Sequence, residues 1–293
     1  IVDASFFRQF CSPIVLLANF SKAVYCNDEK LEGTVQVANY GEYPLTDAHI
    51  LCELEFPESG LVLTQKESIS RIDIGMNMLP MNFQFDLSDI DKATKAVLRL
   101  KIAGTDFHNE WNVWVYPSNQ SVDFQDIVFT GDFNIVQKAL QGGKKVLFNP
   151  DCQQLKGLEG KFVPVFWSPV HFTDQAGTMG LLLDSKHPVF AHFPTEYHSD
   201  WQWWPLTVNS KALYSDSIYQ QITPLVECID NFSNNRRLCN LFETKCLNGK
   251  LIVCSMDLIR NQYKYPEVKQ LLYSIVEYMK SDKFMPETKI ELS

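Results

Sequence analysis

The chain has 293 residues, of which 45% are hydrophobic and 21% charged, and its formal net charge is −9. The composition is that of a folded globular protein, and the length predicts two domains at roughly 150 residues each. The acidic charge argues against nucleic acid or an anionic membrane surface as a partner, because phosphate binding needs clustered Lys and Arg, whereas a neutral ligand such as a carbohydrate is compatible with it.

The start of the chain, IVDASFFRQF, lacks the basic beginning, apolar middle and small-residue cleavage site of a signal peptide. No apolar run in the sequence reaches the roughly 20 residues that a membrane-spanning helix needs. We therefore expect no insertion into a membrane. The chain is expected to be a mature product or an excised fragment of a longer protein.

Residues 1–117 have the pattern of an all-β domain. Apolar and polar side chains alternate in five runs, which are GTVQVANYG, HILCELEF, MNFQFDL, AVLRLKIAG and WNVWVYP. Turn residues separate these runs, and period-two runs at such spacing predict an antiparallel sandwich with one solvated face per sheet. The length fits an immunoglobulin-like sandwich of roughly 100 residues.

After a polar connector, SNQSV, the pattern changes to α/β. DIVFTGD, FNIVQKALQ and KKVLFN predict a strand, a helix and a strand, which implies parallel strands joined by a right-handed crossover. The run 161–167 is also apolar. RRLCNLFETK and GKLIVCSMDL are expected strands around an Asn-Gly turn, and residues 265–281 predict an amphipathic helix. We expect residues 118–293 to form an α/β domain with a mostly parallel sheet.

Eight cysteines are present, and none forms a C-x-x-C pair. Zinc-ribbon and thioredoxin-type sites are therefore not expected, and most of the cysteines should be reduced and buried. The phosphate-binding glycine loops and the HExxH and GxSxG motifs are absent as well. The sequence thus predicts no cofactor and no metal.

The densest aromatic cluster is PTEYHSDWQWWP, residues 194–205. Its tryptophans, Trp201, Trp203 and Trp204, could stack on sugar rings, while Glu196 and His198 hydrogen-bond hydroxyl groups. The alternative is packing in the core or between domains, since one Trp buries roughly 150–250 Å².

Two stretches suggest catalysis. Cys152 follows the predicted strand KKVLFN, and with His198 and Glu196 it could form a set like that of class I glutamine amidotransferases. No glycine-flanked turn surrounds the cysteine, and the acid precedes the histidine, so the alternative is a fold without the activity. Glu110 in HNEW resembles the general acid of many glycosidases, but no (β/α)₈ barrel precedes it. We assign no catalytic residue.

The stretch CIDNFSNNRRL places Arg236 and Arg237 near Asp230 on a predicted turn. The two guanidinium groups could hold a hydroxylated ligand. The alternative is a surface turn with a salt bridge.

Several long stretches resemble one family. They are RQFCSPIVLLANFSKAVYCNDEKLEGTVQVANYGEYPL, GTDFHNEWNVWVYP, GTMGLLLDSKHPVFAHFPTEYHSDWQWWPL and NRRLCNLFETKCLNGKLIVCSMDL. They are similar to the region after the catalytic barrel in family 2-type glycoside hydrolases of gut Bacteroidetes, which are similar to β-galactosidase. In that family the catalytic glutamates lie in the barrel, which this chain does not contain.

The resemblance implies a C-terminal accessory region, in which a β-sandwich precedes an α/β domain similar to a degenerate flavodoxin or amidotransferase fold. Its implied partner is the catalytic barrel, on which it would pack or whose substrate cleft it would shape, and its implied location is the periplasm or cell surface. Two alternatives stay open. One is an independent carbohydrate-binding module that uses Trp201, Trp203 and Trp204 on an oligosaccharide. The other is an active or degenerate thiol-dependent, amidotransferase-like enzyme.

Overall fold

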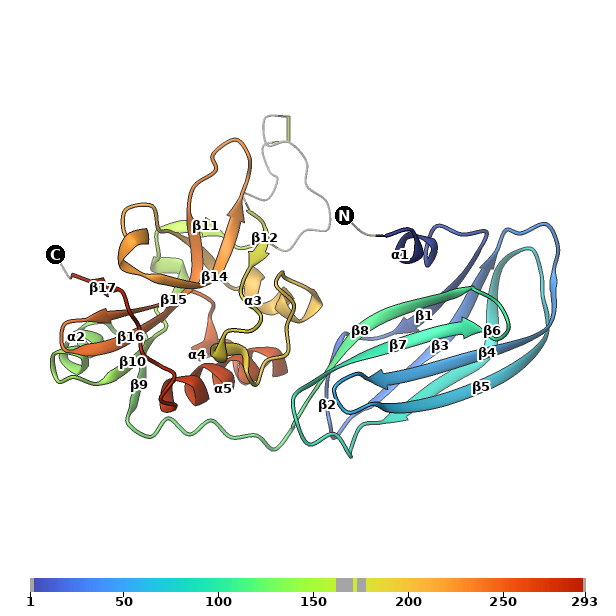
Figure 1. Cartoon of the computed structure of the whole chain (residues 1–293), viewed down its shortest axis with the longest axis horizontal. Helices are drawn as coiled ribbons and strands as arrows, with labels where there is room; N and C mark the ends of the chain where they lie inside the picture. Colours follow the sequence, from blue (N-terminus) through green and yellow to red (C-terminus); the bar gives the residue numbers. More distant parts are fainter. Residues whose placement is uncertain (1–2, 162–170, 173–177, 292–293) are drawn as a thin grey trace. The chain divides into compact units, whose positions relative to one another are not determined.

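The computed structural model describes residues 3–161, 171–172 and 178–291 of the chain. The chain divides into two compact units, Ile1–Asn119 and Gln120–Ser293, which run from blue to green and from green to red in Figure 1. This division lies close to the predicted boundary at residue 117. No helix among the described residues has the length and apolarity to cross a bilayer.

The first unit consists of two sheets after a short helix, α1 (Ala4–Arg8). The three-stranded sheet has the order β1 (Ile14–Phe20), β3 (Lys30–Asn39), β6 (Gly75–Asp86). The five-stranded sheet has the order β2 (Val24–Cys26), β8 (His108–Tyr116), β7 (Thr94–Ile102), β4 (Leu45–Phe56), β5 (Leu61–Ile72). All pairings among these strands are antiparallel except that of β2 with β8.

The alternation in the sequence explains how the two sheets form a sandwich. On β7, Ala96, Leu98 and Leu100 are buried, and the side chains between them are only partly exposed on the other face. Buried apolar side chains from both sheets form one core cluster, with Val35 and Val37 of β3 among them. A strand that places every second side chain in the core gains burial on one face and keeps the other hydrated.

The second unit contains a nine-stranded mixed sheet. Its main path is β11 (Gly157–Glu159), β13 (Lys211–Tyr214), β15 (Leu238–Cys246), β16 (Gly249–Cys254), β10 (Lys145–Phe148), β9 (Ile127–Thr130). Off this path, β14 (Thr223–Asp230) pairs with β12 (Thr178–Leu182) and with β15, and β17 (Lys289–Ile290) also pairs with β15.

The helices of the second unit are α2 (Phe133–Gln141), α3 (Trp204–Val208), α4 (Leu258–Asn261) and α5 (Pro266–Lys280). The side chain of Asp132 caps α2, and Gly143 follows it with a φ of 73°. Helix α5 is the amphipathic helix expected near the C-terminus, and its Tyr278 hydroxyl donates to the Glu243 carboxylate of β15 at 2.8 Å.

The expectation of a mostly parallel sheet is wrong for the described residues. Parallel pairing occurs among β9, β10 and β16 and between β15 and β17, whereas five other pairings of this sheet are antiparallel. Only the first two strands are joined by the predicted strand–helix–strand unit. Two of these antiparallel pairings, β14 with β15 and β15 with β16, are hairpins that return the chain at once, and the other three join strands that are not consecutive in the chain. The apolar run expected at 161–167 lies outside the described residues beyond Lys161.

Candidate functional site

The aromatic segment 194–205 is held by β12 and by a capped turn. The amide of Leu183 donates to the carbonyl of Tyr197 at 3.0 Å, and Leu182 forms an isolated antiparallel bridge with His198. The Asp200 carboxylate accepts from the amide of Gln202 and so caps the 3₁₀ turn Trp201–Trp203, which leads into α3. Helical turns place side chains three residues apart on the same side.

Trp203 belongs to the core, which corrects the expectation of a three-tryptophan ligand surface. Its side chain is 0% exposed, and its ring meets those of Phe190 and Phe193 edge to face, with centroids at 6.2 and 5.1 Å. Its Nε1 donates to Thr195 Oγ1 at 2.9 Å. A side chain enclosed in this way cannot stack on a sugar.

The other aromatic side chains of this segment are exposed. Trp201 is 60% exposed, Trp204 is 43% exposed and Tyr197 is 63% exposed. His198 is exposed too, with its ring edge to face on Tyr197 at 4.7 Å, while Glu196 is half-buried. We call Tyr197, Trp201 and Trp204 the aromatic surface. Exposed Trp and Tyr rings are enriched in binding surfaces because their rings are apolar and their N–H or O–H groups are polar.

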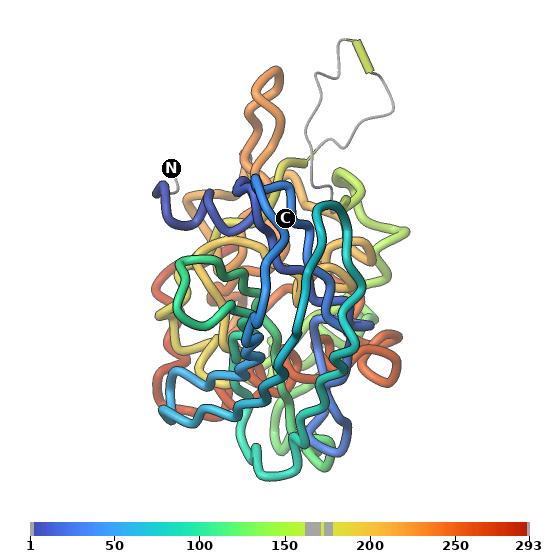
Figure 2. Tube along the Cα trace, turned by 90° about the vertical axis from the view of Figure 1, so that its right-hand side faces the viewer, coloured from blue at the N-terminus to red at the C-terminus, as the bar shows by residue number. Residues whose placement is uncertain are grey.

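Arg236 has a structural role in the hairpin between β14 and β15, the orange loop that rises from the sheet in Figures 1 and 2. Its Nε donates to Asp230 Oδ2 at 2.8 Å and its Nη2 to Oδ1 at 3.2 Å, while the Asp230 side chain is 1% exposed. Burial alone raises the pKa of Asp230, but the hydrogen bonds from Arg236 outweigh it, and the net pKa is lowered. The alternative of a turn with a salt bridge therefore describes Arg236.

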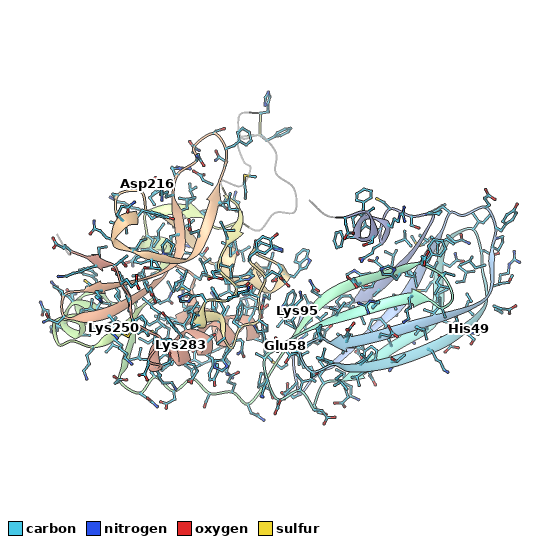
Figure 3. All side chains as sticks on the ribbon, viewed as in Figure 1. His49, Glu58, Lys95, Asp216, Lys250 and Lys283 are labelled. Atoms are coloured by element: carbon cyan, nitrogen blue, oxygen red, sulfur yellow. The ribbon has the colours of Figure 1, made fainter. Side chains whose placement is uncertain are left out.

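Arg237 is exposed, and its guanidinium lies over the Tyr219 ring at 3.9 Å. Its backbone amide donates to the carboxylate of Asp216, labelled in Figure 3 on the loop that follows β13. A cation–π contact of this kind leaves the guanidinium edge accessible. Arg237 is thus at the base of the hairpin, next to the first residue of β15.

Cys152 lies in a different place from His198. It follows β10, in a cavity of about 270 Å³ that Asp257, Arg260 and Lys211 also line. Burial raises the pKa of the thiol, and Asp257 raises it further. The charged groups that act on this thiol are Asp257, Arg260, Asp151 and Lys211, and none of them is a histidine.

The predicted Cys–His–Glu set is therefore not assembled. A nucleophilic cysteine needs an adjacent base that makes the thiolate, but this cysteine is held as the thiol. Within the described ranges, no three His, Cys, Asp or Glu side chains gather as a metal site would require.

Glu110 forms part of an ion-pair row on the outer face of the five-stranded sheet. Arg99 of β7 lies between Glu55 of β4 and Glu110 of β8, with N–O distances of 2.9 and 3.1 Å. The alternating strands bring these three side chains to one face, where Glu110 is directly opposite Arg99 and Glu55 is its diagonal neighbour. Glu110 is thus a polar residue of a strand, as the non-catalytic interpretation expects.

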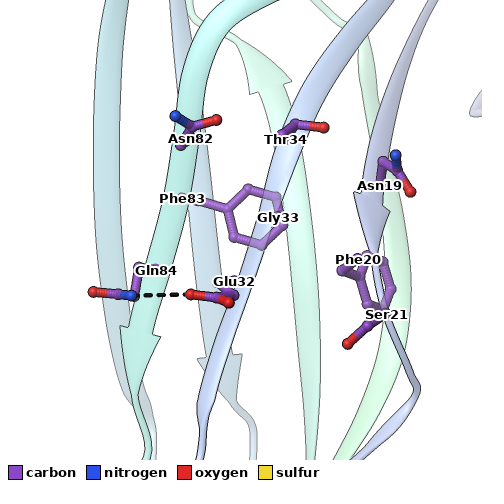
Figure 4. A pocket seen from close by; sticks show the side chains of 9 residues that line it. All are labelled: Asn19, Phe20, Ser21, Glu32, Gly33, Thr34, Asn82, Phe83 and Gln84. Carbon is purple, nitrogen blue, oxygen red and sulfur yellow. Dashed lines mark hydrogen bonds between the residues drawn. The ribbon is translucent and has the colours of Figure 1, made fainter.

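The structure also shows a groove that sequence reasoning missed. It crosses the outer face of the three-stranded sheet and encloses about 560 Å³ (Figure 4). We call it the amide groove, and its lining is Asn19, Phe20, Ser21, Glu32, Gly33, Thr34, Asn82, Phe83 and Gln84. Ligand cavities commonly have roughly 300–1,000 Å³.

Strand register explains how this lining is brought together. Asn19 of β1 pairs with Thr34 of β3, and Thr34 pairs with Asn82 of β6, so the three side chains form one row across the sheet (Figure 4). Glu32 and Gln84 form the next row, in which Gln84 Nε2 donates to Glu32 Oε2 at 3.0 Å. The signal in the sequence was polar residues at the outward positions of three strands, but their adjacency depends on the strand pairing.

The fold and these surfaces define a two-unit, β-rich protein with an exposed aromatic surface and an amide-lined groove. Residues 128–293 match the family described as "Domain of unknown function (DUF8487)", and the chain belongs to this family. Residues 29–117 match "Domain of unknown function (DUF8488)". No curated protein matches the chain.

Solved structures resemble the chain only weakly. A β-glucuronidase of Parabacteroides merdae shares 8% identity over 46% of this chain and 21% of its own, with a TM-score of 0.25. A cycloisomaltooligosaccharide glucanotransferase of Paenibacillus sp. shares 10% identity over 50% of this chain and 21% of its own, with a TM-score of 0.28. A CARDB domain of Pyrococcus furiosus shares 10% identity over 36% of this chain and 94% of its own, with a TM-score of 0.28. Likenesses with such low TM-scores indicate no function. The chain matches 21% of the β-glucuronidase and 21% of the glucanotransferase.

Proposed function

We propose that this chain is a non-catalytic accessory region of a carbohydrate-degrading glycoside hydrolase of the β-galactosidase-like type. The observation that carries the proposal is the aromatic surface, in which Tyr197, Trp201 and Trp204 are exposed within one short segment. Flat rings of this kind pack on the apolar faces of sugars, and the acidic chain suits a neutral ligand. The aromatic surface would hold oligosaccharide at the substrate cleft.

The long stretches similar to the post-barrel region of family 2-type glycoside hydrolases support the same proposal. The partner we propose from them is a catalytic barrel outside this chain, and the proposed location is the periplasm or cell surface. We also propose that the first unit is an immunoglobulin-like sandwich and that the second unit is related to flavodoxin-like domains. The amidotransferase-like alternative has no support from the surroundings of Cys152, where the thiol is kept protonated.

The proposal is tested by titrating the chain with neutral β-linked oligosaccharides and following tryptophan fluorescence and heat. Covering roughly 75 Å² of each exposed ring is worth about 2 kcal/mol at ~25 cal/mol per Å². Replacing Trp201 or Trp204 by Ala should therefore weaken binding about thirtyfold, because each 1.4 kcal/mol is roughly a factor of ten.

The matched control is Tyr263→Ala, which removes an 89% exposed ring elsewhere in the same unit and should leave the affinity unchanged. If Trp201→Ala and Trp204→Ala both bind as tightly as the unmodified chain, the aromatic surface is not the binding surface. Turnover of aryl glycosides by the purified chain would refute the non-catalytic assignment.

A further inference from the structure

The amide groove contains polar side chains that form no hydrogen bond within the described part of the chain. Asn19 and Asn82 are exposed, and among the described residues neither side chain has a hydrogen-bond partner. Between them, Thr34 Oγ1 is enclosed and also lacks a partner in the described part of the chain. An enclosed hydroxyl without a partner costs free energy, so its satisfaction by a ligand is favourable.

A glycine at a core-facing position of β3 lies beneath the groove, next to the buried Phe83 ring. A Cβ at Gly33 would lie 2.4 Å from the carbonyl oxygen of Asn19 and 2.6 Å from Phe83 Cζ. Only a residue without a side chain fits this position while β1 and the Phe83 ring lie so close. Phe20 borders one end of the groove, while its partly buried ring packs inward on the core and meets Trp111 edge to face at 6.3 Å.

The chemistry of the lining selects a neutral polyhydroxyl ligand. An Asn or Gln side chain carries both donors and acceptors, and so does a sugar hydroxyl. Side chains paired across a sheet stand about 5 Å apart, so neighbouring members of a row can reach different hydroxyls of one bound sugar. The lining has no Lys or Arg and includes Glu32, which disfavours an anion.

The position of the groove argues against an extended peptide. A peptide that adds a strand needs the unpaired edge of a sheet. The amide groove is instead centred on β3, which pairs with β1 on one side and β6 on the other. The polar rows lie on the face of the sheet, where a ligand meets side chains rather than main-chain groups.

We propose that the amide groove is a second binding site for a neutral oligosaccharide, held by Asn19, Thr34 and Asn82. The proposal rests on the proposed function for the class of its ligand, but it concerns the other unit of the chain and other residues. Glu32 and Gln84 extend the site to a second row, where the carboxylate accepts from a hydroxyl or keeps its bond to the amide.

The test uses the full chain labelled with ¹⁵N and titrated with neutral tetrasaccharides of differing linkage. The side-chain NH₂ resonances of Asn19 and Asn82 are expected to shift with saturation. Loss of one hydrogen bond to a neutral ligand should weaken the Kd at this site roughly 3- to 10-fold, so Asn82→Ala and Thr34→Val should each show a loss of this order. Raising the salt from low to high concentration should leave the Kd unchanged because the ligand is neutral.

The matched control is Gln36→Ala, which removes an amide from the same face of β3, two pairs along, outside the groove. It should bind as the unmodified chain does. Unshifted NH₂ resonances, or equal Kd values for Asn82→Ala and Gln36→Ala, would overturn the groove proposal. The double variant Trp201→Ala/Trp204→Ala separates the two proposals, because it should remove binding at the aromatic surface and leave the NH₂ shifts of the groove intact.

Discussion

Replacing Trp203 by Ala should destabilise the second unit far more than any other change in the aromatic segment. The side chain is fully enclosed by Phe190, Phe193 and their neighbours, and its Nε1 is bonded to Thr195 Oγ1. Roughly 200 Å² of buried ring at ~25 cal/mol per Å² is worth about 5 kcal/mol. Measured Trp→Ala changes in cores cost about 3–5 kcal/mol, which agrees.

The assay is urea unfolding followed by far-ultraviolet circular dichroism. With a urea dependence of about 2 kcal/mol per M, a loss of about 4 kcal/mol moves the midpoint down by about 2 M. Hydrogen exchange read by mass spectrometry assigns the change to the second unit, since the two units can unfold separately.

Trp201→Ala provides the comparison, because its ring is mostly exposed, and it should cost less than about 1 kcal/mol. The reasoning is refuted if Trp203→Ala and Trp201→Ala change the free energy of unfolding equally. Equal effects of the two substitutions would make Trp203 a candidate ligand contact again.

Three further predictions concern other parts of the chain. The pKa of Asp230 is lowered in the folded state, so its stabilising contribution is present above the unfolded value of about 3.9 and is lost as the pH falls through the lower folded pKa. Asp230→Asn should lower the free energy of unfolding by about 2 kcal/mol at pH 7. Between pH 7 and 3, urea unfolding should show that the variant loses less of its free energy of unfolding than the unmodified chain does. Gly33→Ala should reduce the free energy of unfolding of the first unit by about 1–3 kcal/mol and so lower its melting temperature, because its Cβ would meet a backbone oxygen at 2.4 Å; an unchanged melting temperature contradicts this. Iodoacetamide at neutral pH should alkylate exposed Cys11 well before buried Cys152, and peptide mass spectrometry showing the reverse order would indicate an activated thiol.

Local signals in the sequence predicted several elements closely. Helix α2 occupies the predicted residues 133–141, because its cap, its apolar spacing and the following glycines all act within a dozen residues. The turn between β15 and β16 was predicted from Asn248-Gly249, and the last helix from its apolar spacing. The period-two runs of the first unit likewise correspond to strands of a β-rich fold.

Elements without a regular apolar face were missed. Strand β5 has only Ile69 and Ile72 buried, so its alternation is too weak to recognise. The mostly antiparallel pairing of the second unit was also missed, because periodicity identifies a strand but not its neighbour. Strand pairing is a long-range property, and a single strand–helix–strand unit was extended to the whole sheet.

The candidate site, too, depends on long-range contacts that the sequence pattern does not reveal. Sequence alone could not tell which tryptophan of WQWW turns inward, because that depends on the phase of the turn set by the Asp200 cap. Arg236 was predicted either to grip a ligand or to form a salt bridge, and the buried Asp230 decides for the salt bridge. The amide groove was missed because Asn19, Thr34 and Asn82 are far apart along the chain and meet only through register.

Calorimetric titration of the full chain with a panel of neutral β-linked oligosaccharides tests the central claim of a carbohydrate-binding accessory region most directly. A saturable heat with at least one sugar, unaffected by salt and reduced to the part contributed by the amide groove on combining Trp201→Ala with Trp204→Ala, is the predicted result. The absence of heat with every sugar of the panel would contradict the claim.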